Sequence, residues 1–190
     1  LGNFEFSALL GVKGAKAFED EPSLYTEAAA AASQTMRLIA RVIDSRQAAG
    51  HARVAVFCES TTQLKILRCY LERQERTVGT LLLFDGALSA AQRASIVRQF
   101  LECDKGVLLL SGAGSIGITL CPGCEVLLSV GSLPWNASTI DQAFGRIYRI
   151  GQDKPVEIIQ FAARRSVTSA KLGLHADKRE RLARAPLERL

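Results

Sequence analysis

The stretch GVLLLSGAGSIGITLCPGCEVLLSV, residues 106–130, decides the fold class. Its two apolar runs, 106–111 and 125–130, are short and apolar on both faces, which predicts buried strands. Between them, residues 112–117 read GxGxxG, a pattern that after a strand is typical of dinucleotide binding. That site needs a helix to hold the pyrophosphate, and Cys121-Pro122-Gly123 leaves no room for one. We therefore expect a glycine-rich loop between strands, open to the approach of a phosphate or another backbone.

Apolar strands and amphipathic helices alternate on both sides of this stretch. Further strands are predicted at 53–57, 80–84 and 156–161. Helices are predicted at 26–49, 61–74, 89–101 and 138–149, followed by a basic helix that closes the chain. Ser60 or Thr61 would cap the second helix and Ser89 the third. This alternation predicts an α/β fold with a parallel sheet covered on both faces.

Ligands of parallel sheets bind at the carboxyl ends of the strands. That rule directs attention to the loops 58–61, 85–89, 111–120 and 131–138. We expect any phosphate-contacting backbone to lie in these loops.

The charge of the chain is concentrated at one end. The 190 residues suit one domain, and the formal net charge is +5. Residues 1–163 are balanced, whereas residues 164–190 carry eight Lys and Arg against three Asp and Glu. This basic tail fits a polyanion such as DNA, or a solubilising helix. No apolar run approaches the ~18 residues of a membrane span, and the start at Leu1 without a leader indicates a fragment of a longer, non-secreted protein.

The five cysteines do not form a disulfide pattern. They are odd in number and scattered through apolar segments: Cys58, Cys69, Cys103, Cys121 and Cys124. Such usage is typical of a reduced, intracellular protein. The last two have metal-ligand spacing but no second pair, so a structural role is favoured over a metal site.

A second informative stretch is DQAFGRIYRIGQ, residues 141–152. On a continuous helix, Gln142, Arg146 and Arg149 would share a stripe roughly 60° wide. Two fixed cations and an amide would then point in one direction. A solvated helix surface explains the same pattern, so the stretch alone decides nothing.

Together with four other segments, this stretch resembles the second RecA-like lobe of the Swi/Snf-type, helicase-related ATPases. The matching segments are QAFGRIYRIGQ (142–152), AGSIGITL (113–120), LPWN (133–136), FDGALSAAQRASIVRQF (84–100) and GHARVAVFCES (50–60). The resemblance runs from about Ser33 to Phe161 in the family's order. It implies a RecA-like three-layer α/β fold with a central, mainly parallel sheet and helices on both faces. We expect a poorly ordered leader at 1–25, the lobe at 26–163 and a basic helical extension at 164–190.

The resemblance also implies a function. The full-length protein would be a DNA-dependent ATPase that translocates on double-stranded DNA and holds ATP with Mg²⁺ between two lobes. Arg149 would be the arginine finger with Arg146 as its partner, and Gln142 and Gly117 would also contact the nucleotide. The residues expected to contact DNA are Ser60, Thr61, Ser111, Thr119, Trp135 and Asn136. Because the chain has no Walker A or B pattern, the Mg²⁺ ligands would lie on the N-terminal lobe, and this piece alone is predicted to be inactive.

The implied partners are that N-terminal lobe and double-stranded DNA, with nucleosomes as a further candidate, in the nucleus and without a membrane. Some positions depart from the family pattern, among them Ser115, Thr119, Ser132 and Ala137. They leave open a different function, a degenerate lobe that binds DNA or protein without catalysis. Translocation and strand separation, and the kind of DNA substrate, are equally open.

Overall fold

The structure, a computed structural model, describes residues 34–73, 78–112, 118–131, 137–162 and 165–184. Its centre is a five-stranded sheet in the order β2-β3-β1-β4-β5, with every neighbouring pair parallel. The strands are β1 (Arg53–Cys58), β2 (Thr80–Phe84), β3 (Gly106–Ser111), β4 (Val126–Val130) and β5 (Glu157–Gln160). The helices are α4 (Gln34–Ala48), α5 (Thr61–Arg73), α6 (Ala90–Glu102), α7 (Ala137–Phe144) and α8 (Val167–Arg184).

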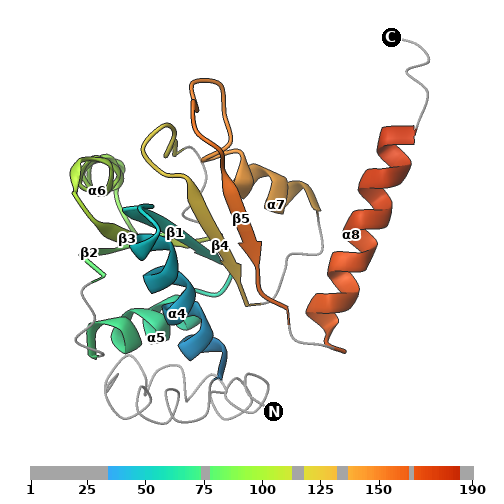
Figure 1. The fold of residues 1–190 in the computed structure, drawn as a ribbon, viewed down its shortest axis with the longest axis horizontal. Coiled ribbons are helices and arrows are strands. Elements are labelled where there is room, and N and C mark those ends of the chain that lie inside the picture. Colours follow the sequence, from blue (N-terminus) through green and yellow to red (C-terminus); the bar gives the residue numbers. More distant parts are fainter. Residues whose placement is uncertain (1–33, 74–77, 113–117, 132–136, 163–164, 185–190) are drawn as a thin grey trace.

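These elements confirm the predicted α/β fold and its parallel sheet (Figure 1). Each strand begins and ends within one residue of its predicted bounds. The three central strands are buried along almost their whole length, as their apolar sequences require. The predicted leader at 1–25 lies outside the described residues, as does the first part of the helix predicted at 26–49.

Side chains that alternate along the strands build two cores, one on each face of the sheet. Val54 and Val56 pack with residues of α4 and α5 on one face. Ala55 and Phe57 pack with Phe100 of α6 and with residues of α7 on the other face. Each large side chain fully buried in this way contributes about 1.5–3 kcal/mol. The result is three layers, helix–sheet–helix.

The connection from β3 to β4 crosses β1, and its described residues form no helix. Its described part, residues 118–125, makes turns, as the sequence predicted. Ile118, Leu120 and Cys124 are buried there and belong to the same core as α6 and α7. Their side chains cover the sheet where a crossover helix would otherwise lie.

Two helices begin at serine caps, as their local sequences predict. Ser89 caps α6 with a reciprocal capping box, because its hydroxyl accepts from the amide of Gln92 and the Gln92 side chain accepts from the amide of Ser89. Ser60 caps α5, since its Oγ accepts from the amide of Gln63 at 3.3 Å. Among the described helices, none is long and apolar enough to cross a lipid bilayer.

Candidate functional site

The arginine pair does not lie on a regular helix, so the prediction of a helix over 138–149 was wrong at its end. The helix α7 stops at Phe144, and residues 145–152, here called the arginine turn, follow it as a series of turns. The amides of Arg146 and Ile147 bond to carbonyls three residues back, at 3.2 and 3.1 Å. Such tight bonds are typical of a helix that is ending, and Gly145 is a poor helix former.

A long-range hydrogen bond draws the backbone away from the helix at this point. The amide of Leu120 donates to the carbonyl of Arg146 at 2.9 Å. The thiol of Cys121 lies 3.8 Å from the carbonyl of Arg149. The arginine turn is therefore attached along its length to the segment that leads into β4.

Both arginine side chains also contact this segment. Arg146 donates from Nη1 to the carbonyl of Ile118 at 3.4 Å, and its Nε is buried without a hydrogen-bond partner in the described part of the chain. Arg149 is exposed and donates from Nη1 to the hydroxyl of Thr119 at 3.0 Å. Within the described ranges, neither arginine pairs with a carboxylate. Two cations thus stand close to one another with only neutral oxygens as partners.

The residues around the pair are unusually exposed. Tyr148 is 74% and Ile150 102% exposed, although both are large and apolar. Gln142 is exposed on the last turn of α7. Ile150 follows Phe144 in this series of turns and faces solvent.

The predicted DNA contacts lie partly at the carboxyl edge of the sheet. Ser60 and Thr61 stand at the start of α5, directly after β1. Ser111 ends β3 beside Cys58 of β1, but it is completely buried and offers no hydroxyl to the surface. Its contact with DNA stays a prediction to which the structure adds no support. Thr119 lies elsewhere, against Arg149.

Three further predicted site residues, Gly117, Trp135 and Asn136, lie outside the described residues. Arg93 of α6 makes its contacts within the domain. Its guanidinium donates to the carbonyls of Leu88 and Gly86 at 3.0 and 3.2 Å and stacks over Phe84.

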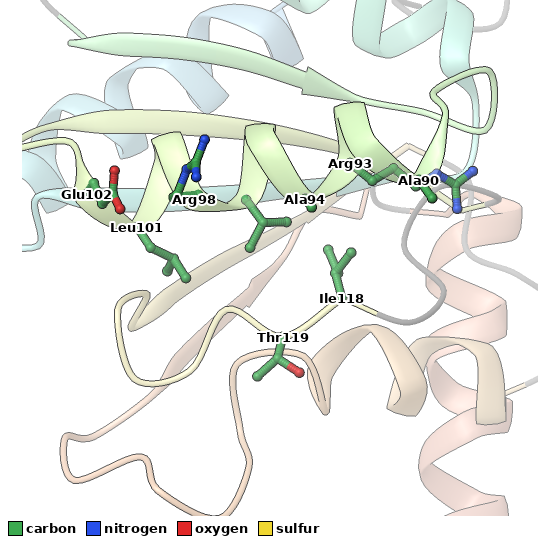
Figure 2. A pocket seen from close by; sticks show the side chains of 9 residues that line it. Ala90, Arg93, Ala94, Arg98, Leu101, Glu102, Ile118 and Thr119 are labelled. Carbon is green, nitrogen blue, oxygen red and sulfur yellow. The ribbon is translucent and has the colours of Figure 1, made fainter.

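A groove of about 680 Å³ borders Thr119 (Figure 2). One wall is the outer face of α6, and the other is formed by Ile118 and Thr119. Small and apolar side chains such as Ala94 and Val97 line it, with Arg98 and Glu102 also in its wall. Because Thr119 accepts the hydrogen bond from Arg149, the arginine turn lies next to this hollow surface.

Two of the cysteines, Cys58 and Cys124, act as apolar residues rather than reactive groups. Burial raises the pKa of Cys58 to about 11 and that of Cys124 to about 12. All five cysteines are free thiols. Among the described residues, no group of three or more metal-ligating side chains comes together.

Comparison with known proteins identifies relatives of this chain. Residues 34–151 match the family described as "Helicase conserved C-terminal domain". A "Helicase-like transcription factor CHR27" from Arabidopsis thaliana is 31% identical over 152 residues, which cover 76% of this chain and 14% of the relative. The "DNA repair protein RAD5" of Saccharomyces cerevisiae is 32% identical over 133 residues, covering 67% of this chain and 11% of the relative. The chain thus spans about a seventh or less of these two relatives.

A solved structure shares the fold. The structure described as "Crystal structure of the C-terminal part of Fun30 ATPase domain" superimposes with a TM-score of 0.65 at 23% identity. The match covers 73% of this chain and 44% of that one. At this identity the likeness establishes the fold, which is RecA-like.

Proposed function

This chain belongs to the helicase conserved C-terminal domain family, and we propose that it is the second lobe of a DNA-dependent ATPase of the Swi/Snf type. In this role it contributes arginines to ATP bound against an N-terminal RecA-like lobe, and backbone contacts to double-stranded DNA. ATP-driven translocation on the duplex follows from the two lobes moving relative to each other. The Mg²⁺ ligands and the phosphate-binding lysine lie on the other lobe, because this sequence contains no GxxxxGK[ST].

The observation that carries the proposal is the uncompensated charge of the arginine turn. Arg149 is exposed, and among the described residues its guanidinium donates to the neutral hydroxyl of Thr119. No carboxylate is paired with it among the described residues. A guanidinium held in this way is available to an anion such as a phosphate.

The two arginines have different surroundings and, in the proposal, different roles. Arg149 reaches outward and acts as the finger that stabilises charge on the transferred phosphoryl group. Arg146 is half-buried behind it, with its Nε free of a described partner, and raises the positive potential at the same place. Gln142, exposed on the preceding helical turn, orients the phosphate or the attacking water.

The site for DNA is separate from the site for nucleotide. Ser60 and Thr61 follow the carboxyl end of β1, whereas the arginine turn is attached to residues 118–124, which lead into the amino end of β4. Because β1 and β4 are parallel neighbours, the two groups lie toward opposite ends of the strands. This separation supports a lobe that contacts the duplex and the nucleotide at the same time. Trp135 and Asn136 stay predicted DNA contacts, whereas Thr119 lies against Arg149 and Ser111 is buried.

A two-lobe protein tests the proposal. Arg149→Ala should lower DNA-stimulated ATP hydrolysis by about 10³-fold or more, with nucleotide binding largely retained. Arg41→Ala is the matched control, because Arg41 is an exposed arginine of α4 on the opposite face of the sheet. Unchanged turnover in Arg149→Ala would reject the finger. Absence of turnover in the unmutated two-lobe protein would favour the alternative, a degenerate, non-catalytic lobe that binds DNA or protein in a multidomain nuclear protein.

A further inference from the structure

The ion pair of Lys154 and Glu125, to which His51 is hydrogen-bonded, lies beside the arginine turn, and these three residues are here called the ion bridge. Glu125 accepts a 2.6 Å hydrogen bond at Oε1 from Nζ of Lys154, and its Oε2 lies 2.9 Å from Nδ1 of His51. The Glu125 side chain is 18% exposed, whereas that of Lys154 is 67% exposed. A single carboxylate therefore joins the turn before β1, the residue before β4 and the loop before β5.

Gln152, the last residue of the arginine turn, connects the turn to this bridge. Its Nε2 donates to the carbonyl of Cys124 at 3.0 Å and to that of Ile147 at 3.3 Å. Its backbone amide donates to the carbonyl of Arg149 at 3.1 Å. Cys124 is the neighbour of Glu125 in the sequence, and Gln152 lies two residues before Lys154. The end of the arginine turn at Gln152 is therefore fixed next to the ion bridge.

We infer that Glu125 is a positioning residue for Arg149, an inference that rests on the proposed function. The arginine turn has the helix α7 at one end but no regular structure at the other. The Lys154–Glu125 contact closes that second end, and His51 holds the carboxylate in the orientation that Lys154 requires. Arg149 itself is exposed and has little packing to keep it in place.

The physical reason is that a finger acts only at the right distance. A displacement of about 1 Å at a reacting group costs up to about 10²-fold in rate. The hydrogen bond from Lys154 lowers the pKa of Glu125 most, with a smaller contribution from His51 and an opposing effect of burial. The carboxylate is therefore charged at neutral pH, and the bridge is intact under the conditions in which the enzyme works.

The two-lobe protein provides the test, with saturating DNA and varied ATP. Glu125→Gln keeps the shape and removes the charge; kcat should fall roughly tenfold while KM for ATP stays within about twofold. Lys154→Met should act in the same direction, and Lys154→Arg, which keeps the cation, should retain the wild-type kcat. Glu72→Gln removes a carboxylate from the exposed Arg68 pair on α5 and should change neither constant.

Arg149→Ala, measured in parallel, separates the two proposals. Unchanged turnover in Arg149→Ala overturns the proposed function. A large loss in Arg149→Ala with wild-type kcat in Glu125→Gln and Lys154→Met overturns only the positioning role. A rise in KM without a fall in kcat also overturns it. If Glu125→Gln lowers the yield of folded protein, Lys154→Met decides, because that side chain is two-thirds exposed and its loss leaves the fold intact.

Discussion

The guanidinium of Arg149 donates a 3.0 Å hydrogen bond to the hydroxyl of Thr119, thirty residues earlier in the chain. Thr119 belongs to the segment between β3 and β4, and Arg149 to the turn after α7. The contact links two stretches that the sequence analysis connected only through a family resemblance. It also gives Thr119 a role besides the predicted contact with DNA.

Thr119→Val should lower DNA-stimulated turnover in the two-lobe protein by about fivefold, or about 1 kcal/mol, because Arg149 loses one oriented acceptor. Thr119→Ser keeps the hydroxyl and should retain the rate. Measuring kcat at saturating DNA distinguishes the two roles. If Thr119 acts only through DNA, the variant will weaken DNA affinity and leave that kcat unchanged.

Arg53 is predicted to be the most costly arginine to remove for stability. Its Nε donates to the carbonyl of Gly123 at 2.6 Å, and its Nη1 donates to the carbonyls of Leu101 and Cys103 at 2.8 and 3.0 Å. One side chain thus fastens the end of α6 and the turn before β4 to the start of β1. Arg53→Met leaves these part-buried carbonyls without a charged donor and should cost about 3 kcal/mol of unfolding free energy.

Urea denaturation of the variants measures this cost. Arg68→Met is the control, since Arg68 pairs with Glu72 on the exposed surface of α5 and such pairs contribute about 0.5 kcal/mol or less. Equal losses in the two variants would show that the three carbonyl contacts of Arg53 add nothing to stability.

The contrast between Arg53 and Ser89 shows what could be predicted from the sequence. The cap at Ser89 joins residues three apart, so it was visible in the local sequence, and the predicted cap is confirmed. The acceptors of Arg53 lie 48 to 70 residues away, and no local pattern reveals them. The strands were also predictable from local sequence, because each is a short run of apolar residues.

The early end of α7 has one cause in the local sequence and one in a long-range contact. Gly145 was visible in the sequence, but the bond between the Leu120 amide and the Arg146 carbonyl was not. The periodicity of 141–152 therefore predicted a helix that continues past Phe144, where α7 in fact ends. The assignment of Arg146 and Arg149 came from the family resemblance, and their contacts with Ile118 and Thr119 came only from the structure.

The stability of the fold should depend on acidic pH through Glu125. Its pKa in the folded protein lies below the ordinary value of 4.5, chiefly because of the hydrogen bond from Lys154. A carboxylate whose pKa is lowered by folding stabilises the folded state at pH values above its unfolded-state pKa. This stabilisation is lost as the pH falls through the folded-state pKa. The unfolding free energy of the wild type should therefore decline toward that of Glu125→Gln below about pH 4.5.

Urea titrations between pH 7 and pH 3 give this difference directly. The exposed carboxylate variant Glu72→Gln serves as the reference for general effects of acid on the fold. A difference between wild type and Glu125→Gln that stays constant over the whole range would mean that the Glu125 carboxylate does not stabilise the folded state through its charge.

Thiol reactivity should divide the cysteines according to burial. With a pKa of about 11, only about 10⁻³ of the Cys58 thiol is ionised at pH 8, and Cys124, with a pKa of about 12, is ionised still less. Cys121 is half-buried beside the carbonyls of Arg149 and Ile150, and its thiol is open to solvent on one side. Brief treatment with iodoacetamide followed by peptide mapping should therefore label Cys121 and leave Cys58 and Cys124 unmodified. Labelling in denaturant should reach all five cysteines, and early labelling of Cys124 in the folded protein would mean that the core beneath the arginine turn opens on the time scale of the reaction.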